Sequence, residues 1–245
     1  DSIAFFRKWL EDIVDSQSPE GRIPNTAPHL GGGGGYAWGN AVCYVTKYLY
    51  AFTGDTAIVK KSYGAILRWL SYCEKHRDGD YIIRSNSHDW LLGDWLAPEM
   101  IASDVYYINT VTYLQAVEIA AELAEIAEPN RVEALKTLSA AIKEGIHRAF
   151  FHGETASYSN GVQGEDVLAL AAGIVPEEWL EAVRKRVEHH YKEETDYHLD
   201  TGIILTPVLI AYLTNHGYRD IAYGIMTAKT YPSYQTLMEN DTTLS

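Results

Sequence analysis

The chain has 245 residues, of which 47% are hydrophobic and 22% charged, and its formal net charge is −13. This length is sufficient to bury the core of a folded domain. The negative charge argues against nucleic acid or an anionic membrane as a partner, because their phosphate groups would be repelled. It is compatible with a neutral substrate, and even more simply with a charged surface that keeps the protein soluble.

No targeting or membrane segment is recognisable in the sequence. No hydrophobic run approaches the ~20 residues that a membrane-spanning helix needs. The chain starts at Asp1 inside a helical pattern, with no basic segment followed by an apolar stretch. We expect a fragment of a longer protein, and a cytoplasmic location is slightly favoured without being decided.

The cysteines Cys43 and Cys73 both fall in apolar helical patterns. They lack the C-x-x-C spacing of a zinc or redox site, so we expect buried free thiols. The carboxylates lack the spacing of a calcium loop, and no glycine-rich segment lies between a strand and a helix. We therefore expect no metal and no cofactor.

Hydrophobic residues recur at offsets of three and four along almost the whole chain, which predicts amphipathic helices. Val59, Tyr63, Ile66 and Leu70 illustrate the spacing, since all four lie on one helix face. In chain order, the expected helices cover residues 5–14, 39–52, 59–73, 104–128, 132–150, 163–172, 180–191, 202–215 and 218–229. A short hairpin arm is expected at 80–84.

Residues typical of helix ends separate these segments. Gly54 followed by Asp55 has the pattern of a glycine that ends one helix and an N-cap that begins the next. Pro129 and Pro176 suit the first turns of the helices they open. Gly217 marks a tight connection between two helices. About nine helices in consecutive hairpins are therefore expected.

The connections between the helices alternate between short and long, and residues 16–38, 76–98 and 231–245 form the long ones. In a closed ring of helical hairpins, short turns collect on one rim and long loops on the other, where a site is built. We expect one all-α domain over residues 1–245 with this architecture. A helical bundle or a solenoid remains open on these grounds.

The first long connection contains five consecutive glycines and then Trp38 and Asn40. An exposed indole can stack on the C–H face of a sugar ring while a nearby amide binds its hydroxyl groups. This pair is therefore a candidate carbohydrate-binding site. The alternative is that Trp38 anchors the loop to the helical core.

The second long connection contains His88 and Asp89, followed by Trp90, Asp94 and Trp95. Carboxylates accept hydrogen bonds from vicinal hydroxyl groups, and tryptophan supplies a flat apolar surface. We expect Asp94 and Trp95 to bind sugar. The alternatives are that Trp90 fills the core together with a leucine and that one aspartate caps a helix.

Histidines accompany polar residues in two later places. His198 lies just before Asp200 and Thr201, where a helix is expected to begin, so either of those two residues is a possible cap. His198 is a candidate binding residue and, equally, a structural histidine. The doublet of His189 and His190 beside an acidic run is expected to be a solvated helix end.

Several segments together resemble the catalytic domain of the bacterial α-L-rhamnosidases. They are FFRKWLEDI (5–13), GRIPNTAP (21–28), AWGNA (37–41), LYAFTGD (49–55), GDWLAP (93–98), HLDTGIILTP (198–207), NHGYRDIAY (215–223), TYPSY (230–234) and NDTTL (240–244). Their order is the family's order, and they span nearly the whole chain. The GDWLAP block and the TYPS to TTL block are the most specific.

The resemblance implies an (α/α)6 toroid of six helical hairpins, incomplete here because about nine helices are fewer than twelve. It implies hydrolysis of terminal α-L-rhamnose with inversion by a carboxylic acid and a carboxylate base. The family's acid lies upstream of the FFRKWL helix and its base just past the TTL block. We expect both outside residues 1–245, so that this fragment alone is inactive.

Sugar-binding positions carry over from the family to Trp38, Asp94 and Trp95. At Asn40 the family usually has aspartate, which removes a negative charge from beside the transition state. The expected partner is a rhamnoside, and self-association through exposed helix faces is expected of an open ring. The alternative function is a non-catalytic carbohydrate-binding or scaffold toroid.

Overall fold

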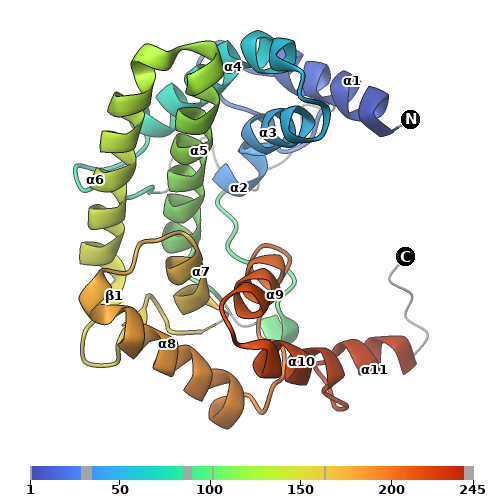
Figure 1. The fold of residues 1–245 in the computed structure, drawn as a ribbon, viewed down its shortest axis with the longest axis vertical. Helices are drawn as coiled ribbons and strands as arrows, with labels where there is room; N and C mark the ends of the chain where they lie inside the picture. Colours follow the sequence, from blue (N-terminus) through green and yellow to red (C-terminus); the bar gives the residue numbers. More distant parts are fainter. Residues whose placement is uncertain (1, 29–34, 85–89, 101, 163, 240–245) are drawn as a thin grey trace. The chain divides into compact units, whose positions relative to one another are not determined.

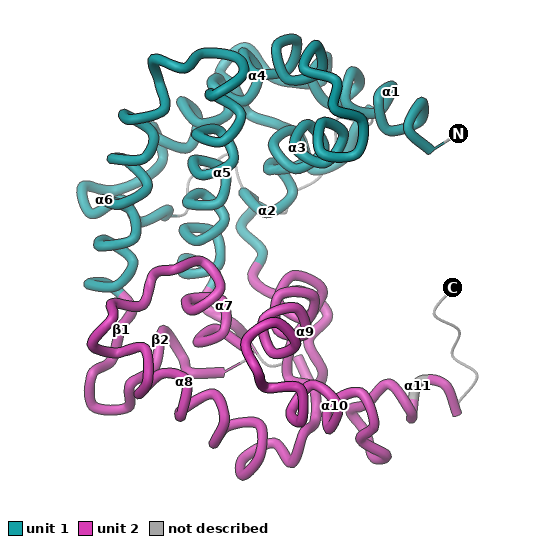
Figure 2. Tube along the Cα trace, in the orientation of Figure 1, with its two compact units in different colours: residues 1–92, 105–149 teal, residues 93–104, 150–245 magenta. Residues whose placement is uncertain are grey.

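The computed structural model describes residues 2–28, 35–84, 90–100, 102–162 and 164–239. The chain forms two compact units (Figure 2). Unit 1 comprises Asp1–Leu92 and Val105–Ala149, and unit 2 comprises Gly93–Asp104 and Phe150–Ser245. Helices dominate both units, and the described residues contain a single sheet of two short strands, so the expected all-α class is confirmed.

Unit 1 is a packed set of helices (Figure 1). It comprises α1 (Ser2–Asp15), α2 (Tyr36–Gly39), α3 (Ala41–Thr53), α4 (Thr56–Lys75), α5 (Val105–Ala127), the 3-10 turn η2 (Pro129–Arg131) and α6 (Val132–Phe150), whose last residue falls in unit 2. Helix α3 packs against α1 and α4, and α4 packs against α5. Fully buried side chains of α4 and α5, among them Trp69, Tyr72 and Tyr113, form the core of this unit.

Several predicted helix boundaries in unit 1 are confirmed. Gly54 ends α3 with a φ of 68°, a left-handed conformation that favours glycine. The Asp55 carboxylate accepts a hydrogen bond from the Ala57 amide at 2.9 Å and caps α4. Cys43 and Cys73 are buried and are not joined in a disulfide, as expected. The hairpin expected at 80–84 is reduced to one isolated bridge between Arg77 and Ile83.

Unit 2 is built from shorter elements. They are the 3-10 turn η1 (Pro98–Met100), β1 (Phe151–His152), β2 (Ser157–Tyr158), α7 (Glu165–Ala171), the 3-10 turn η3 (Glu177–Trp179), α8 (Leu180–His189), the π-helical turn η4 (His190–Glu194), α9 (Leu205–Asn215), α10 (Arg219–Thr227) and α11 (Tyr234–Glu239). Helix α7 is largely buried and packs against α8 and α9, and α10 packs against α9. This unit carries the loop that contains Trp95.

Two features of unit 2 differ from the sequence expectation. Helix α9 begins at Leu205 and not at Gly202, and the amides of residues 202 to 204 just before it donate to Asp94 and Trp95. The antiparallel strands β1 and β2 and the short helix α11 were not expected, since segments this short show no clear periodicity.

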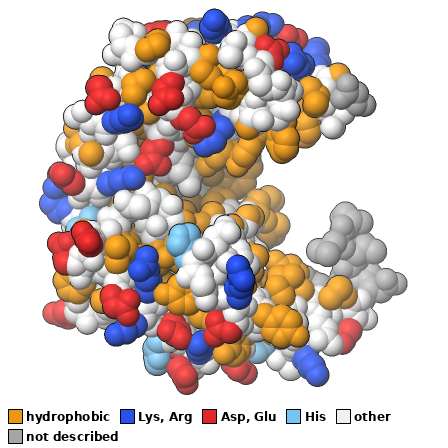
Figure 3. All heavy atoms as spheres, in the orientation of Figure 1, with side chains coloured by type: hydrophobic (Ala, Val, Ile, Leu, Met, Phe, Trp, Pro, Cys, Tyr) orange, Lys and Arg blue, Asp and Glu red, His pale blue; other side chains and the backbone are white. Residues whose placement is uncertain are grey.

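The surface carries side chains of both charge signs, interspersed over the face in Figure 3. In the part of the chain that the structure describes, no helix is both long and apolar enough to cross a membrane. Helices α1 and α3 of unit 1 also expose large aromatic residues, namely Phe5, Phe6 and Phe52. Self-association through such faces stays a prediction.

Candidate functional site

The loop at residues 93–98 is attached to the start of α9 through the Asp94 side chain. The Asp94 carboxylate accepts hydrogen bonds from the backbone amides of Ile204 at 2.8 Å and Leu205 at 3.1 Å, and a very short one from Gly202. It therefore caps α9 from a segment more than one hundred residues earlier. The sequence left open whether an aspartate of this loop caps a helix, and the structure shows that Asp94 does.

Burial and hydrogen bonding act in opposite directions on the pKa of the Asp94 carboxyl group. Its side chain is buried, and burial raises its pKa above the ordinary value. The three backbone N–H groups oppose this shift because they stabilise the carboxylate, while the negative charge of Asp200 adds to it. The backbone amide of Asp94 donates to the Ser103 hydroxyl at 2.7 Å, which fixes the loop from its other side.

Trp95 follows directly and has a different environment. Its carbonyl oxygen accepts a hydrogen bond from the Ile203 amide at 2.9 Å. A Cβ at Gly202 would lie 2.2 Å from the same oxygen, so this approach requires glycine. The Trp95 side chain, in contrast, is 52% exposed. The result is an indole on a backbone held at both residues 94 and 95, a suitable platform for a sugar ring.

Asn40 and Trp38 lie in unit 1. Asn40 is fully buried: its Oδ1 accepts from the indole N–H of Trp69 at 2.8 Å, and its Nδ2 donates to the carbonyl of Thr112 at 2.7 Å. The side chain thus joins α4 to α5, so the structure gives no support to the expectation that it binds hydroxyl groups. Trp38, on α2, is partly exposed. Convergence of these residues with Asp94 and Trp95 stays a prediction.

The remaining predicted residues have mixed outcomes. The ring of His198 is held by the Thr195 carbonyl at 2.8 Å and the Thr230 hydroxyl at 2.7 Å, which favours its structural alternative. The expectation that Trp90 fills the core is wrong, since it is 68% exposed while the adjacent Leu91 is buried. His88, Asp89 and the glycines Gly31–Gly34 lie outside the described residues.

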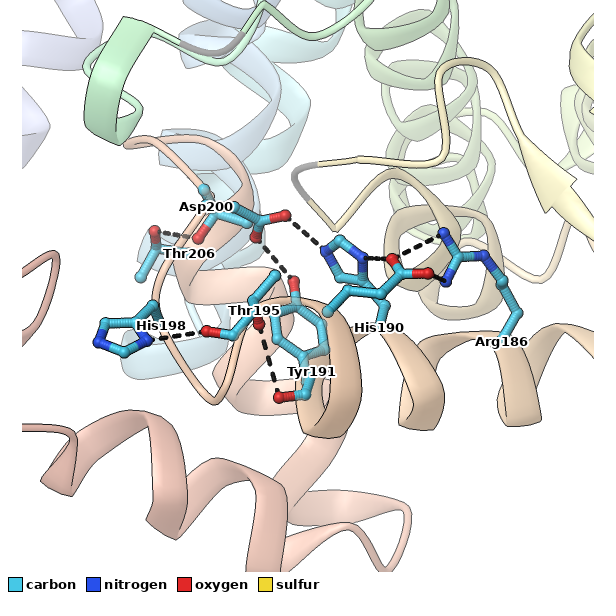
Figure 4. Close-up of polar contacts among 9 residues, drawn as sticks. Arg186, His190, Tyr191, Thr195, His198, Asp200 and Thr206 are labelled. Atoms are coloured by element: carbon cyan, nitrogen blue, oxygen red, sulfur yellow. Dashed lines mark hydrogen bonds and ion pairs between the residues drawn. The ribbon is translucent and has the colours of Figure 1, made fainter.

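His190 was expected at a solvated helix end, and this is wrong. Its side chain is buried, and its two ring nitrogens lie 2.8 Å from Glu194 Oε2 and 2.7 Å from Asp200 Oδ2 (Figure 4). The Tyr191 hydroxyl donates to the other Asp200 oxygen at 3.1 Å. His190 and Glu194 are the first and last residues of the π-helical turn η4. The Asp200 carboxylate is thus bound by His190 and Tyr191, while the cap at the start of α9 is Asp94.

Two further buried carboxyl groups were missed by the sequence analysis. Glu165 and Asp166 open α7, and burial raises the pKa of Glu165 to about 7 and that of Asp166 to about 6. Glu165 accepts hydrogen bonds from the amides of Asp104 and Asn160, both at 2.9 Å, and Asp166 accepts one from Tyr158. The only available signal was two adjacent acids at the start of an otherwise apolar helix.

Within the described residues, no group of three or more His, Cys, Asp or Glu side chains is arranged to hold a metal ion. The buried carboxylates of unit 2 instead bind backbone amides, as Asp94 and Glu165 do, or the His190 ring, as Asp200 does. Among them, Asp94 holds in place the loop that carries the exposed Trp95 indole.

Comparison with known proteins gives one consistent result. Residues 1–245 match the model of the bacterial alpha-L-rhamnosidase six-hairpin glycosidase domain. An alpha-L-rhamnosidase of Streptomyces avermitilis is 30% identical over 236 residues, which cover 96% of this chain and 22% of that protein. An alpha-L-rhamnosidase of Formosa agariphila is 26% identical, covering 96% of this chain and 26% of that protein. The chain thus spans about a quarter of the length of these relatives.

Solved structures agree in fold. The Streptomyces avermitilis alpha-L-rhamnosidase complexed with L-rhamnose superposes with a TM-score of 0.85 at 27% identity, covering 98% of this chain and 22% of that one. The alpha-L-rhamnosidase of Dictyoglomus thermophilum gives a TM-score of 0.89 at 27% identity, covering 98% of this chain and 28% of the other. The resemblance in the sequence is confirmed, and this chain belongs to the bacterial alpha-L-rhamnosidase six-hairpin glycosidase domain family.

Proposed function

We propose that the protein carrying this domain hydrolyses terminal α-L-rhamnosides with inversion and that Trp95 supplies part of its sugar-binding surface. The observation that carries the proposal is an exposed indole on a loop fixed at the backbone. A flat apolar surface with restricted motion binds a sugar ring at low entropic cost. Relatives that match nearly the whole chain are alpha-L-rhamnosidases, and one was solved with L-rhamnose.

The buried carboxyl groups of unit 2 are unsuited to direct proton transfer to a sugar. Glu165 is completely buried and Asp94 is engaged by three backbone amides. A general acid must reach the glycosidic oxygen, and a general base must reach water on the opposite face of the sugar. We assign neither role to a residue of this chain, and we propose that Asp94 acts on the sugar only by positioning Trp95.

Binding of L-rhamnose tests the contribution of Trp95. We expect saturable binding of L-rhamnose to residues 1–245, measured by NMR titration, and about tenfold weaker binding by Trp95→Ala, since an aromatic–ligand contact contributes on the order of 1 kcal/mol. Trp95→Phe should lie between the two proteins. Tyr223→Ala removes an exposed aromatic ring from α10 of the same unit and should leave binding unchanged.

Hydrolysis is tested on the longest natural protein that carries this domain. An aryl α-L-rhamnoside should be cleaved, with the β-anomer of rhamnose appearing first in the NMR spectrum, as inversion requires. Residues 1–245 alone should bind without turnover. Binding by the long protein without hydrolysis would favour a non-catalytic carbohydrate-binding toroid, and first release of the α-anomer would contradict inversion.

A further inference from the structure

His190 lies between two carboxylates with both ring nitrogens at hydrogen-bonding distance, 2.8 Å from Glu194 and 2.7 Å from Asp200. A neutral imidazole has one N–H and can donate only one hydrogen bond. An imidazolium donates two, and each is charge-assisted when the acceptor is a carboxylate. The geometry therefore fits the protonated ring.

The charged groups around this ring come from four segments. Glu194 lies on η4, Asp200 lies in the loop before α9, Arg186 lies on α8 and Asp166 lies on α7. Arg186 forms a bidentate pair with Glu194 at 3.0 and 3.1 Å, and the exposed His189 is 3.6 Å from the same carboxylate.

The balance of these charges favours a cation at His190. Burial lowers the pKa of His190, and the positive charge of Arg186 lowers it further. The hydrogen bond and charge of Asp200 and the hydrogen bond of Glu194 outweigh both effects, so that the pKa of His190 lies above its ordinary value of 6.5. The Tyr191 hydroxyl, which donates to Asp200, leaves the net charge of the cluster unchanged.

Asp200 lies two to three residues before the backbone amides that bind Asp94 and Trp95, so it links the His190 cluster to the Trp95 loop. It precedes Gly202, whose amide binds the Asp94 carboxylate, and Ile203, whose amide binds the Trp95 carbonyl. The same segment also approaches Trp95 too closely for any residue but glycine at position 202. A displacement of Asp200 would therefore be transmitted through the backbone to both Asp94 and Trp95.

We propose that His190 is a positioning residue whose protonated ring holds Asp200, and through residues 200–205 fixes the backbone of Trp95, so that the Trp95 loop is ordered only while His190 carries its proton. The link to sugar binding rests on the proposed function, but the ordering of Trp95 does not. Loss of the proton leaves the ring with one N–H, so Asp200 loses the positive charge of its partner and competes with Glu194 for the single remaining hydrogen bond.

The first experiment follows both groups in the unaltered protein. Nitrogen-15 NMR of the His190 ring reports its protonation, and 5-fluorotryptophan with ¹⁹F NMR reports Trp95, whose signal is assigned by its loss in Trp95→Phe. Below the pKa of His190 both ring nitrogens should carry protons. As pH rises, the Trp95 signal should shift or broaden with the midpoint of His190. A Trp95 signal that is constant across the His190 titration would overturn the proposal.

Three variants separate the two hydrogen bonds. Asp200→Asn weakens the link to the loop and His190→Gln removes the charge, so each should abolish the pH dependence of the Trp95 signal. Glu194→Gln leaves the bond between His190 and Asp200 intact, so the Trp95 signal should keep its pH dependence, with a lower midpoint. His152→Gln, the same change at an exposed histidine of unit 2, should match the unaltered protein. If the Trp95 signal keeps its pH dependence in both Asp200→Asn and His190→Gln while these variants remain folded, the positioning role of His190 is contradicted.

The consequence for sugar binding is measured separately. At a pH below the His190 midpoint, His190→Gln should bind L-rhamnose about fivefold more weakly than the unaltered protein, a coupling at the low end of the usual range. The two proteins should converge above the midpoint. If the Trp95 NMR signal changes with the protonation of His190 but neither protein binds rhamnose, the proposed function fails and the positioning role stands. Rhamnose binding that is equal in both proteins at every pH would remove the coupling to the sugar.

Discussion

At the scale of single residues, polar side chains that the sequence places in loops are largely used to hold the fold together. Asn40 connects two helices of unit 1 and Asp94 caps a helix of unit 2. Both residue types also bind sugar hydroxyl groups, because the same lone pairs and N–H groups serve either partner. Within the pairs singled out from the sequence, the structure leaves the indoles more available to a ligand than the amide or carboxylate.

Asp94→Asn should destabilise the protein through α9. The amide keeps one oxygen but places an N–H₂ group against backbone amides that need an acceptor, at a buried site. We expect a loss of about 1–3 kcal/mol in the free energy of unfolding, as for a buried unsatisfied donor. Urea titration followed by circular dichroism measures it. Asp15→Asn, at the exposed end of α1, is the control and should change stability by less than about 0.5 kcal/mol.

At the scale of elements, close contact between helices depends on small residues at particular positions. A Cβ built at Gly39 of α2 would lie 2.3 Å from the Trp69 ring on α4. Trp69 is fully buried and bonded to Asn40, so the ring has little room to move. Gly39 is therefore needed for the packing of α2 on α4 and not for its own backbone conformation.

Gly39→Ala should lower the free energy of unfolding by about 1–3 kcal/mol, as is usual when a core is overpacked. Gly64→Ala supplies the contrast, because Gly64 is an exposed helical position of α4 where an added Cβ meets only the flexible Arg68 side chain at 3.7 Å. There alanine should stabilise the helix by up to about 1 kcal/mol. Thermal unfolding of both variants tests the pair, and a neutral Gly39→Ala would show that Trp69 can move.

At the scale of the whole molecule, the buried acids make stability depend on pH. The pKa of Glu165 is raised to about 7 and that of Asp166 to about 6, so the unfolded chain releases these protons at lower pH than the folded chain. Their contribution is favourable at low pH and is lost as pH rises through the folded pKa values. The raised pKa of His190 acts in the same direction, since its contribution is present below 6.5 and is lost as pH rises through the folded pKa.

The free energy of unfolding should therefore fall by roughly 4 kcal/mol between about pH 5 and about pH 8, because each group loses about 1.4 kcal/mol per pH unit between its unfolded and folded pKa values. Urea unfolding at a series of pH values measures this slope. His190→Gln should flatten the slope by removing one of the groups responsible. Stability that is constant or rises with pH over this range would contradict the raised pKa values of these groups, because carboxyl groups with lowered pKa values, such as Glu194, titrate below about pH 5.

The sequence by itself determined the helical class, the main helix boundaries, the buried thiols and the family. Each of these follows from local spacing or from motifs in a fixed order, such as Gly54 before Asp55 or the GDWLAP block. Only the tertiary structure decided what Asp94, Asn40 and His190 do. Asp94 binds amides near residue 204, Asn40 binds Trp69 and Thr112, and His190 binds Asp200 across a π-helical turn. Whether a polar side chain faces a ligand or the core is set by partners that folding brings close, and sequence spacing does not contain that information.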